Sequence, residues 1–305
     1  MSVTEHFKLS AVDCGETGII TGIRSHGFAS GKQTEALVAD GQLDPTLIAC
    51  LAQDPVIDFS TLDVAAALGA AGIGGLEISA DPAAFYLAKI DDLGAPASGS
   101  VHRSFSMAKG RIAIERISAR QGALVEVPLR AVAVSTDGVT APITFAANVA
   151  LPSLAVATAG WTVGPVSING TALDGIQEID INFGLQMQPI RGDGEPYPVR
   201  LNLTRAPEIT LRALKSSMAS TLGIAGAAQG ATASEIYLRA VGSDGFPVAN
   251  GTSGHIKLSI ASGSIDLADG RANQGSDPAT VGITIRPAWD GTNAIIAVTT
   301  ATTIS

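Results

Sequence analysis

The side chains best suited to chemistry, histidine and cysteine, are few and isolated in this sequence. Four histidines occur with no cysteine or paired carboxylates near them at metal-ligand spacing: His6, His26, His102 and His255. With no export signal ahead of them, Cys14 and Cys50 are expected to be reduced, small, buried residues. These residues predict no metal site and no cofactor.

The short motifs also give no catalytic signature. The glycines of 69–75 do not spell a dinucleotide-binding fingerprint and follow a predicted helix, and no Gly-x-Ser-x-Gly elbow occurs. The tripeptide Arg191-Gly192-Asp193 matches an adhesion motif, but the corresponding turn of the first half reads Val38-Ala39-Asp40, so we interpret the match as coincidence. The sequence therefore predicts that the protein is not an enzyme.

The composition is unusually poor in charge. Charged residues are 15% of the chain, against about 25% in ordinary soluble proteins, while hydrophobic residues are 46%. Such a chain is expected to cover much of its surface with neighbours, which favours an assembly subunit over a compact, isolated β protein. The net charge of −9 divides into −6 for residues 1–152 (10 basic, 16 acidic) and −3 for 153–305 (9 basic, 12 acidic). The sequence contains no stripe of basic residues, so binding of nucleic acid is not predicted. Neither a secretory signal nor a membrane span is expected.

The chain resembles itself at an offset of about half its length. Residues 40–45 read Asp-Gly-Gln-Leu-Asp-Pro, and residues 193–198 read Asp-Gly-Glu-Pro-Tyr-Pro, an offset of 193 − 40 = 153. His102 falls on His255 at this offset, and Asp137-Gly138 falls on Asp290-Gly291. Because Asp-Gly marks tight turns, the shared order indicates shared strand reversals. One residue is lost near Pro55 and Pro207, where the offset becomes 152.

Period-two patterns predict strands along most of the chain. In 179–187, Ile179, Ile181 and Phe183 alternate with Asp180 and Asn182, which places the two polar residues on the wet face of one strand. A helix is expected in each half. In the first it runs from a cap at Ser60 or Thr61 to Gly69, and in the second it carries Leu211, Leu214, Met218 and Leu222 and ends at Gly223.

These patterns predict a mainly β protein built from two tandem homologous domains. The domains are 1–152 and 153–305, each a β-sandwich or open barrel carrying one α-helix. The link between them is expected within 150–164.

One stretch of the second half is similar to a known family. Residues 167–175 (Ser-Ile-Asn-Gly-Thr-Ala-Leu-Asp-Gly), 179–184 and 193–198 resemble the tail tube proteins of long-tailed bacteriophages. The first half differs at residues 41–44, which read Gly-Gln-Leu-Asp where residues 194–197 read Gly-Glu-Pro-Tyr. The resemblance implies subunits that stack as rings around a hollow channel for DNA. Some relatives carry two tube domains in one chain and form trimeric rings that mimic hexamers, which is the arrangement implied here.

The resemblance also implies roles for particular residues. The loops 30–45 and 184–198 are expected to reach a neighbouring ring or domain, with ordinary exposed turns as the alternative. Their candidate assembly residues are Asp40, Gly41, Pro45, Arg191, Asp193, Gly194, Glu195 and Pro198. Asp180 and Asn182 are candidates for the channel lining, with outer solvent as the alternative. An acidic and neutral lining would let DNA pass without adhering.

Partners are therefore expected to be copies of this chain and other tail proteins, with DNA only as non-specific cargo and no membrane. The expected location is the virion tail, after assembly in the host cytoplasm. Besides an enzyme whose site these motifs do not reveal, two other readings stay open. One is another tail ring component, a distal tail or baseplate protein. The other is a cell-surface, carbohydrate-binding β-sandwich protein, although Trp161 and Trp289 are few aromatic residues for stacking on sugars.

Overall fold

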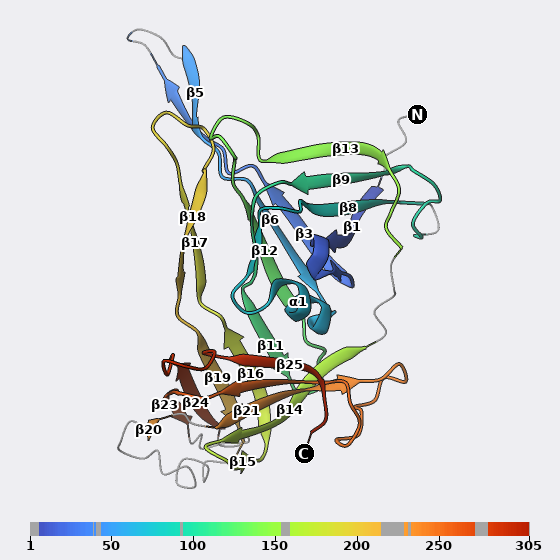
Figure 1. The fold of residues 1–305 in the computed structure, drawn as a ribbon, viewed down its shortest axis with the longest axis vertical. Helices are drawn as coiled ribbons and strands as arrows, with labels where there is room; N and C mark the ends of the chain where they lie inside the picture. Colours follow the sequence, from blue (N-terminus) through green and yellow to red (C-terminus); the bar gives the residue numbers. More distant parts are fainter. Residues whose placement is uncertain are drawn as a thin grey trace.

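The computed structural model describes residues 6–38, 40, 44–91, 94–153, 159–214, 229–230, 233–271 and 280–304. Within these residues the chain is mainly β, as the alternating patterns predict, and its sheets are antiparallel. Figure 1 shows the first half, in blue to green, lying above the second half, in yellow-green to red, along the longest axis.

The first half folds as two five-stranded sheets. The β1 sheet has the order β13-β9-β8-β1-β2, and the β6 sheet has the order β3-β6-β12-β10-β7. The strands of the β1 sheet are β13 (Ile143–Val149), β9 (His102–Met107), β8 (Ala83–Ile90), β1 (His6–Asp13) and β2 (Ile19–Ile20). Those of the β6 sheet are β3 (Ile23–Ala29), β6 (Val56–Thr61), β12 (Val127–Ala133), β10 (Gly110–Ile114) and β7 (Leu76–Ile78). A short 3-10 helix, Gly15–Thr17, joins β1 to β2.

The second half also folds as two sheets. The β14 sheet has the order β15-β14-β21-β22-β25, and the β19 sheet has the order β11-β16-β19-β24-β23-β20. The strands of the β14 sheet are β15 (Thr171–Leu173), β14 (Gly160–Ile168), β21 (Ser234–Val241), β22 (His255–Ile260) and β25 (Ala297–Thr302). Those of the β19 sheet are β11 (Arg116–Arg120), β16 (Ile176–Asn182), β19 (Glu208–Ala213), β24 (Thr280–Pro287), β23 (Gly263–Arg271) and β20 (Gln229–Gly230).

Apart from β11, the strand orders of the two halves correspond term by term. Reading β13-β9-β8-β1-β2 against β25-β22-β21-β14-β15, and β3-β6-β12-β10-β7 against β16-β19-β24-β23-β20, each strand meets its counterpart at an offset close to 153. The strand bulge between Ile23 and Ser25 recurs between Ile176 and Glu178. The sheets do not divide cleanly at residue 152, because β11 of the first half belongs to the β19 sheet.

Each half also extends a two-stranded hairpin away from its sheets. Hairpin β4–β5 joins β4 (Gln33–Leu37) to β5 (Leu47–Ala52), and hairpin β17–β18 joins β17 (Leu185–Ile190) to β18 (Arg200–Arg205). The single strand predicted over 179–187 is therefore wrong in one respect, because it is interrupted at Phe183 and Gly184. Gly184 has φ +59, and the chain turns there from β16 into the hairpin.

His102 and His255 hold the same structural position, as their correspondence predicts. The Nδ1 of His102 accepts a hydrogen bond from the backbone N–H of Lys89 at 3.1 Å, and the Nδ1 of His255 accepts one from Ala240 at 3.0 Å. Both rings are buried. Each imidazole therefore satisfies a backbone donor at the edge of a core.

The first-half helix exists but begins and ends later than predicted. Helix α1 spans Val64–Ala71, and its N-cap is Asp63, whose Oδ1 accepts from the N–H of Ala66 at 3.1 Å. Ser60 and Thr61 belong to β6 instead, where their backbone pairs with β12. Gly72, with φ +59, ends the helix in place of Gly69.

The second-half helix was predicted to begin at Leu211, and this is wrong. Leu211 is a fully buried residue of β19, paired with Ile179 and Ile283. Leu214 follows the end of β19 and is exposed, and the remaining expected positions, Met218, Leu222 and Gly223, lie outside the described residues.

The core of each half lies between its two sheets. Phe59 of the β6 sheet and Phe85 of the β1 sheet meet edge to face, with ring centroids 6.0 Å apart. In the second half, Ile179 and Ile181 are fully buried, as their alternation predicts.

Cys14 is buried, and burial followed by the nearby charge of Asp13 raises its thiol pKa to about 12. Cys50 is exposed, so the expectation that it is buried is wrong, because β5 projects from the sheets.

We predict that replacing the glycine at the base of hairpin β17–β18 destabilises the fold. Gly184→Ala would place a Cβ against the backbone carbonyl of Ala206 at a positive φ, so the free energy of unfolding should fall by about 2 kcal/mol or more. Urea denaturation measures this change. In Gly69→Ala, the added methyl group of helix α1 meets no atom within 4 Å, so a gain of about 0.5–1 kcal/mol is expected. Equal effects of the two substitutions would contradict this account.

Candidate functional site

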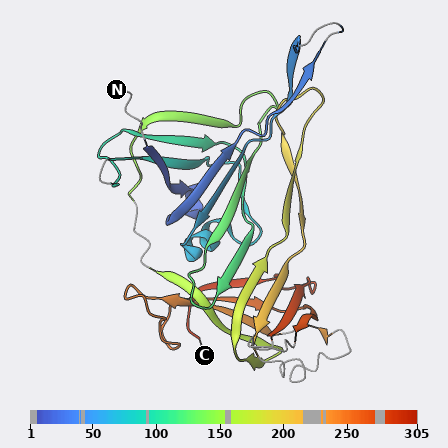
Figure 2. The same cartoon turned by 180° about the vertical axis from the view of Figure 1, so that it is seen from behind.

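Hairpin β17–β18 leaves the second half and lies along the first half, which makes it the main bridge between the two. Figures 1 and 2 show it from opposite sides, running up beside β6 and β12. The chain joins the halves a second time through β11, whose backbone pairs with β16 from Arg116↔Asn182 to Arg120↔Glu178. The two contacts run in opposite directions, since each half supplies one element to the other.

The tip of β17–β18 is held on the first half by backbone hydrogen bonds. The carbonyl of Pro196 accepts from the N–H of Gln53 at 2.8 Å, and the carbonyl of Pro198 accepts from Ser135 at 2.7 Å. The N–H of Tyr197 donates to the carbonyl of Gly138 at 3.1 Å. Bonds of this kind depend on the path of the backbone, so they fix the position of the tip whatever side chains it carries.

Side chains reinforce this contact. Arg191, at the end of β17, forms an ion pair with Asp54 in which both side chains are mostly buried. Lys109 Nζ donates to the carbonyl of Val199 at 3.2 Å. Within the tip, the Glu195 carboxylate accepts from the N–H of Gly192 at 2.6 Å and so holds the turn closed.

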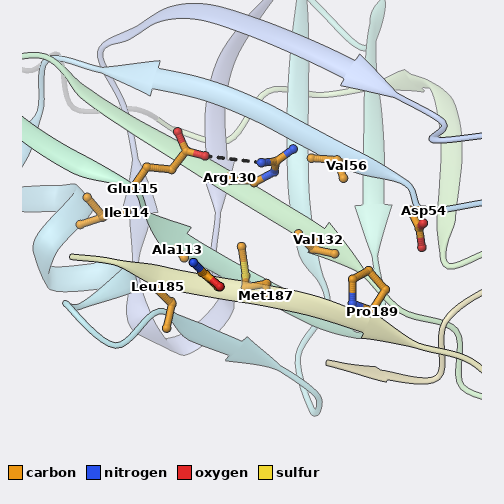
Figure 3. A pocket seen from close by; sticks show the side chains of 11 residues that line it. Asp54, Val56, Ala113, Ile114, Glu115, Arg130, Val132, Leu185, Met187 and Pro189 are labelled. Atoms are coloured by element: carbon orange, nitrogen blue, oxygen red, sulfur yellow. Dashed lines mark ion pairs between the residues drawn. The ribbon is translucent and has the colours of Figure 1, made fainter. Parts of the chain in front are cut away.

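Below the tip, the hairpin and the β6 sheet enclose an open groove of about 420 Å³. Figure 3 shows Leu185, Met187 and Pro189 of β17 facing Ala113 and Val132 of the sheet. Arg130 and Glu115 form an ion pair along its wall at 3.7 Å. The groove is lined mainly by apolar side chains and one charge pair. Strand β17 forms one wall of the groove and the β6 sheet forms the other, so the groove lies between elements of the two halves.

Each half contains a similar acidic turn, around Asp137 in the first half and around Asp290 in the second. Asp137 Oδ1 accepts from the N–H groups of Val139 and Thr140 at 2.9 and 2.7 Å, and Asp290 Oδ1 accepts from those of Thr292 and Asn293 at 2.9 and 2.7 Å. Hydrogen bonds to Thr140 chiefly hold the pKa of Asp137 well below its usual range, and bonds to Asn293 chiefly lower the pKa of Asp290 to about 2. The turn at 137–140 carries Gly138, which contacts Tyr197 of the hairpin tip.

The predicted assembly residues fall in two different settings. The second-half set lies at the tip of β17–β18, where Arg191 and Pro198 contact the first half directly. Glu195, Asp193 and Gly194 shape the turn between them. In the first half, Asp40 and Pro45 lie exposed near the tip of β4–β5, while Gly41 lies outside the described residues.

Asp180 and Asn182 lie on the outer face of the β19 sheet. Asp180 is half-buried between Ser118 and Thr210, and its Oδ1 has no hydrogen-bond partner among the described residues. Asn182 is exposed, and its Oδ1 accepts from the N–H of Gly184 at 2.8 Å. The same face carries cross-strand ion pairs, Arg120–Glu178 at 2.8 Å and Arg286–Glu208 at 3.0 Å. It is therefore a polar surface on which opposite charges are paired.

The sequence patterns did not single out the first-half residues that receive the hairpin. Asp54, Gln53 and Ser135 lie in short connections whose partners are more than 60 residues away in the chain. The available signal was the repeat itself, since the turns 54–55 and 137–138 recur in the second half. Nothing in it indicates that the second hairpin folds onto the first half.

Other kinds of site find little support among the described residues. No group of three or more His, Cys, Asp or Glu side chains gathers there to hold a metal ion. Nor is any helix in that part of the chain long and apolar enough to cross a membrane. No protein-family model matches the chain, and no curated protein matches it.

We predict that the ion pair between Arg191 and Asp54 stabilises the contact between the halves. Arg191→Ala should lower the free energy of unfolding by about 1–3 kcal/mol, because it leaves a mostly buried carboxylate unpaired. A double-mutant cycle with Asp54→Ala measures the coupling. The matched cycle on Arg120 and Glu178, where Arg120 is exposed, should give at most about 1 kcal/mol. Coupling that is no larger for the first pair than for the second would contradict the prediction.

We also predict that the two acidic turns make stability fall in acid. Both carboxylates have a lowered pKa in the folded chain, so the stability they add is present above the unfolded pKa of about 3.9. It is lost as the pH falls toward the folded pKa values, which is about 2 for Asp290. Urea midpoints measured between pH 5 and pH 2 should fall less steeply in Asp137→Asn/Asp290→Asn than in the wild type. Parallel pH profiles would contradict this.

Proposed function

We propose that this chain is a structural subunit that assembles with copies of itself into rings, and that the rings stack into the hollow tail tube of a long-tailed bacteriophage. Three chains per ring would place six similar modules around the channel. The chain would be assembled in the host cytoplasm and end in the virion tail. It would act without catalysis or a cofactor.

One observation carries the proposal. The two halves repeat one strand order, and they meet through a contact that uses different surfaces on each half. A contact between two like units through unlike surfaces can repeat, because each unit keeps the surface that its partner used. Repetition either closes into a ring or continues as a filament. Rings built from chains that each contain two such units have an even number of modules.

The exposed edges of the sheets support the same reading. Strand β3 ends the β6 sheet and β11 ends the β19 sheet, so each leaves backbone groups on one side without a strand partner among the described residues. An open edge of this kind is a hazard for uncontrolled pairing, and ring closure removes it. Tandem duplication of one tube domain, with copies at 1–152 and 153–305, accounts for the repeated strand order.

The charge distribution fits a channel that conducts DNA without binding it. The chain carries a net charge of −9, and the outer face of the β19 sheet pairs its few cations with carboxylates. Phosphates would meet no uncompensated positive stripe on such a surface. We assign Asp180 and Asn182 to the channel side on this ground.

Assembly of the purified protein tests the proposal. We expect light scattering to give a ring mass of three times 30.8 kDa, and negative-stain electron microscopy of concentrated protein to show long tubes of stacked rings. Single rings that never stack would favour a distal tail or baseplate ring protein. A particle that stays monomeric at high concentration would overturn the proposal.

A further inference from the structure

We infer that hairpin β4–β5 binds a second copy of this chain, on the second-half surface that corresponds to the one covered by β17–β18 in the first half. The inference rests on the proposed self-assembly and names the surfaces that would meet. It assigns strands β4 and β5, within the described residues 33–38 and 44–52, as the donor. The receiving surface lies around the turn between β24 and β25, with Trp289 at its centre.

The two hairpins leave their sheets in the same way. Gly31 has φ +57 and its carbonyl accepts from the N–H of Asp54 at 3.3 Å, while Gly184 has φ +59 and its carbonyl accepts from Ala206 at 3.2 Å. The hairpins also pair in the same register, since Ala36↔Ile48 corresponds to Pro189↔Leu201. They are therefore equivalent elements, of which one is docked and the other projects freely.

The receiving surfaces correspond as well. The N–H of Val134 donates to the carbonyl of Lys109 at 3.0 Å, and the N–H of Ala288 donates to Ser262 at 3.0 Å. Between these donors and the next shared turn, at Asp137 and Asp290, the second half is one residue shorter, so Trp289 takes the place of both Ser135 and Thr136. Ser135 donates its N–H to Pro198 of the docked hairpin and is 1% exposed, whereas Trp289 is 69% exposed. An indole this exposed, beside a turn whose counterpart in the first half is covered by the docked hairpin, indicates a missing cover.

The charged pair of the docked contact is replaced on both sides by apolar residues. Arg191 of the hairpin corresponds to Val38 at the offset of 153, and its partner Asp54 corresponds to Ala206 at the offset of 152. Both replacements are exposed in this chain. A matched loss of both charges is what a contact between the β4–β5 tip and a second half requires, because losing only one would leave a buried charge unpaired.

The projecting hairpin has the surface of a buried element. In the docked hairpin, Met187, Pro189 and Leu201 face the first half. At the equivalent positions, β4–β5 carries Thr34, Ala36 and Ile48, and Ile48 is 67% exposed. The opposite face adds Leu37, Leu47 and Leu51, all more than half exposed. A two-stranded hairpin alone in water has little stability, so such a surface is consistent with an element that becomes covered.

The hairpin cannot reach this surface in its own chain. Figures 1 and 2 show β4–β5 at one end of the longest axis and the strands β24 and β25 toward the other end. A second copy must therefore supply the receiving surface. Strand β3 supports the same partner, since its counterpart β16 is joined along one edge by β11, while β3 ends its sheet.

Cysteine cross-linking of the full chain tests the inference. In a Cys50→Ser background, Pro45→Cys and Trp289→Cys should form a disulfide between chains when rings assemble, seen as dimers and trimers on a non-reducing gel. The equivalent pair, Pro198→Cys with Ser135→Cys, is the positive control, because its backbone hydrogen bond brings the two residues within disulfide reach in one chain. Each single variant should give no ladder.

The outcomes separate this inference from the proposed function. Rings in which the control pair cross-links but residues 45 and 289 do not would overturn the docking site and leave the ring intact. A bond between 45 and 289 within one chain would overturn it too. A chain that stays monomeric would remove both proposals together.

A second variant tests the same contact without cysteine chemistry. Ile48→Glu should leave the melting temperature of the monomer unchanged, because Ile48 is largely exposed, and should reduce ring formation at least tenfold. Val139→Glu adds the same charge at an equally exposed position, 67%, outside the hairpin, and should still assemble. Normal ring assembly by Ile48→Glu would contradict the inference.

Discussion

Backbone hydrogen bonds between the tip of β17–β18 and the first half hold the chain in one arrangement. Gln53, Ser135 and Gly138 would otherwise present backbone groups to solvent or to an empty crevice. The prolines of the tip, Pro196 and Pro198, lack donors of their own and offer carbonyls. At these two prolines the hairpin accepts from donors of the first half, whereas at Tyr197 it donates to the carbonyl of Gly138. The groove beneath the bridge follows from that placement.

The two halves use one architecture for different purposes. In the first half the outer face of the β6 sheet is partly covered by β17–β18, and the charge pair of Arg130 and Glu115 lies in the groove wall. On the corresponding face of the second half no hairpin lies among the described residues, and this face carries ion pairs between neighbouring strands. The cores are alike while the outer faces differ, which is expected of repeated modules that meet different neighbours.

Several structural details recur in both halves although the residues that form them differ. Asn148 and Ala301 both have φ near +58 at the same offset, although alanine rarely adopts this conformation. The turns around Asp137 and Asp290 share two backbone hydrogen bonds and one side-chain bond, formed by Thr140 in one half and Asn293 in the other. Geometry is thus repeated where the side chains are not, because the strand connections constrain the backbone first.

The mainly β character, the buried faces of strands such as Ile179–Ile181 and the offset at which turns recur could all be predicted from the sequence. These are local properties, set by side-chain alternation and by residues that favour positive φ. The prediction from the sequence placed the start of α1 a few residues too early and placed Leu211 in a helix. Spacing alone cannot reveal that a residue pairs in a sheet with residues distant in the chain. The crossing of β11 into the second half, and the docking of β17–β18 while β4–β5 projects, became visible only in the folded chain. Those outcomes depend on which surfaces meet in space, and residues 58 or more positions apart leave no periodic trace of such contacts in the chain.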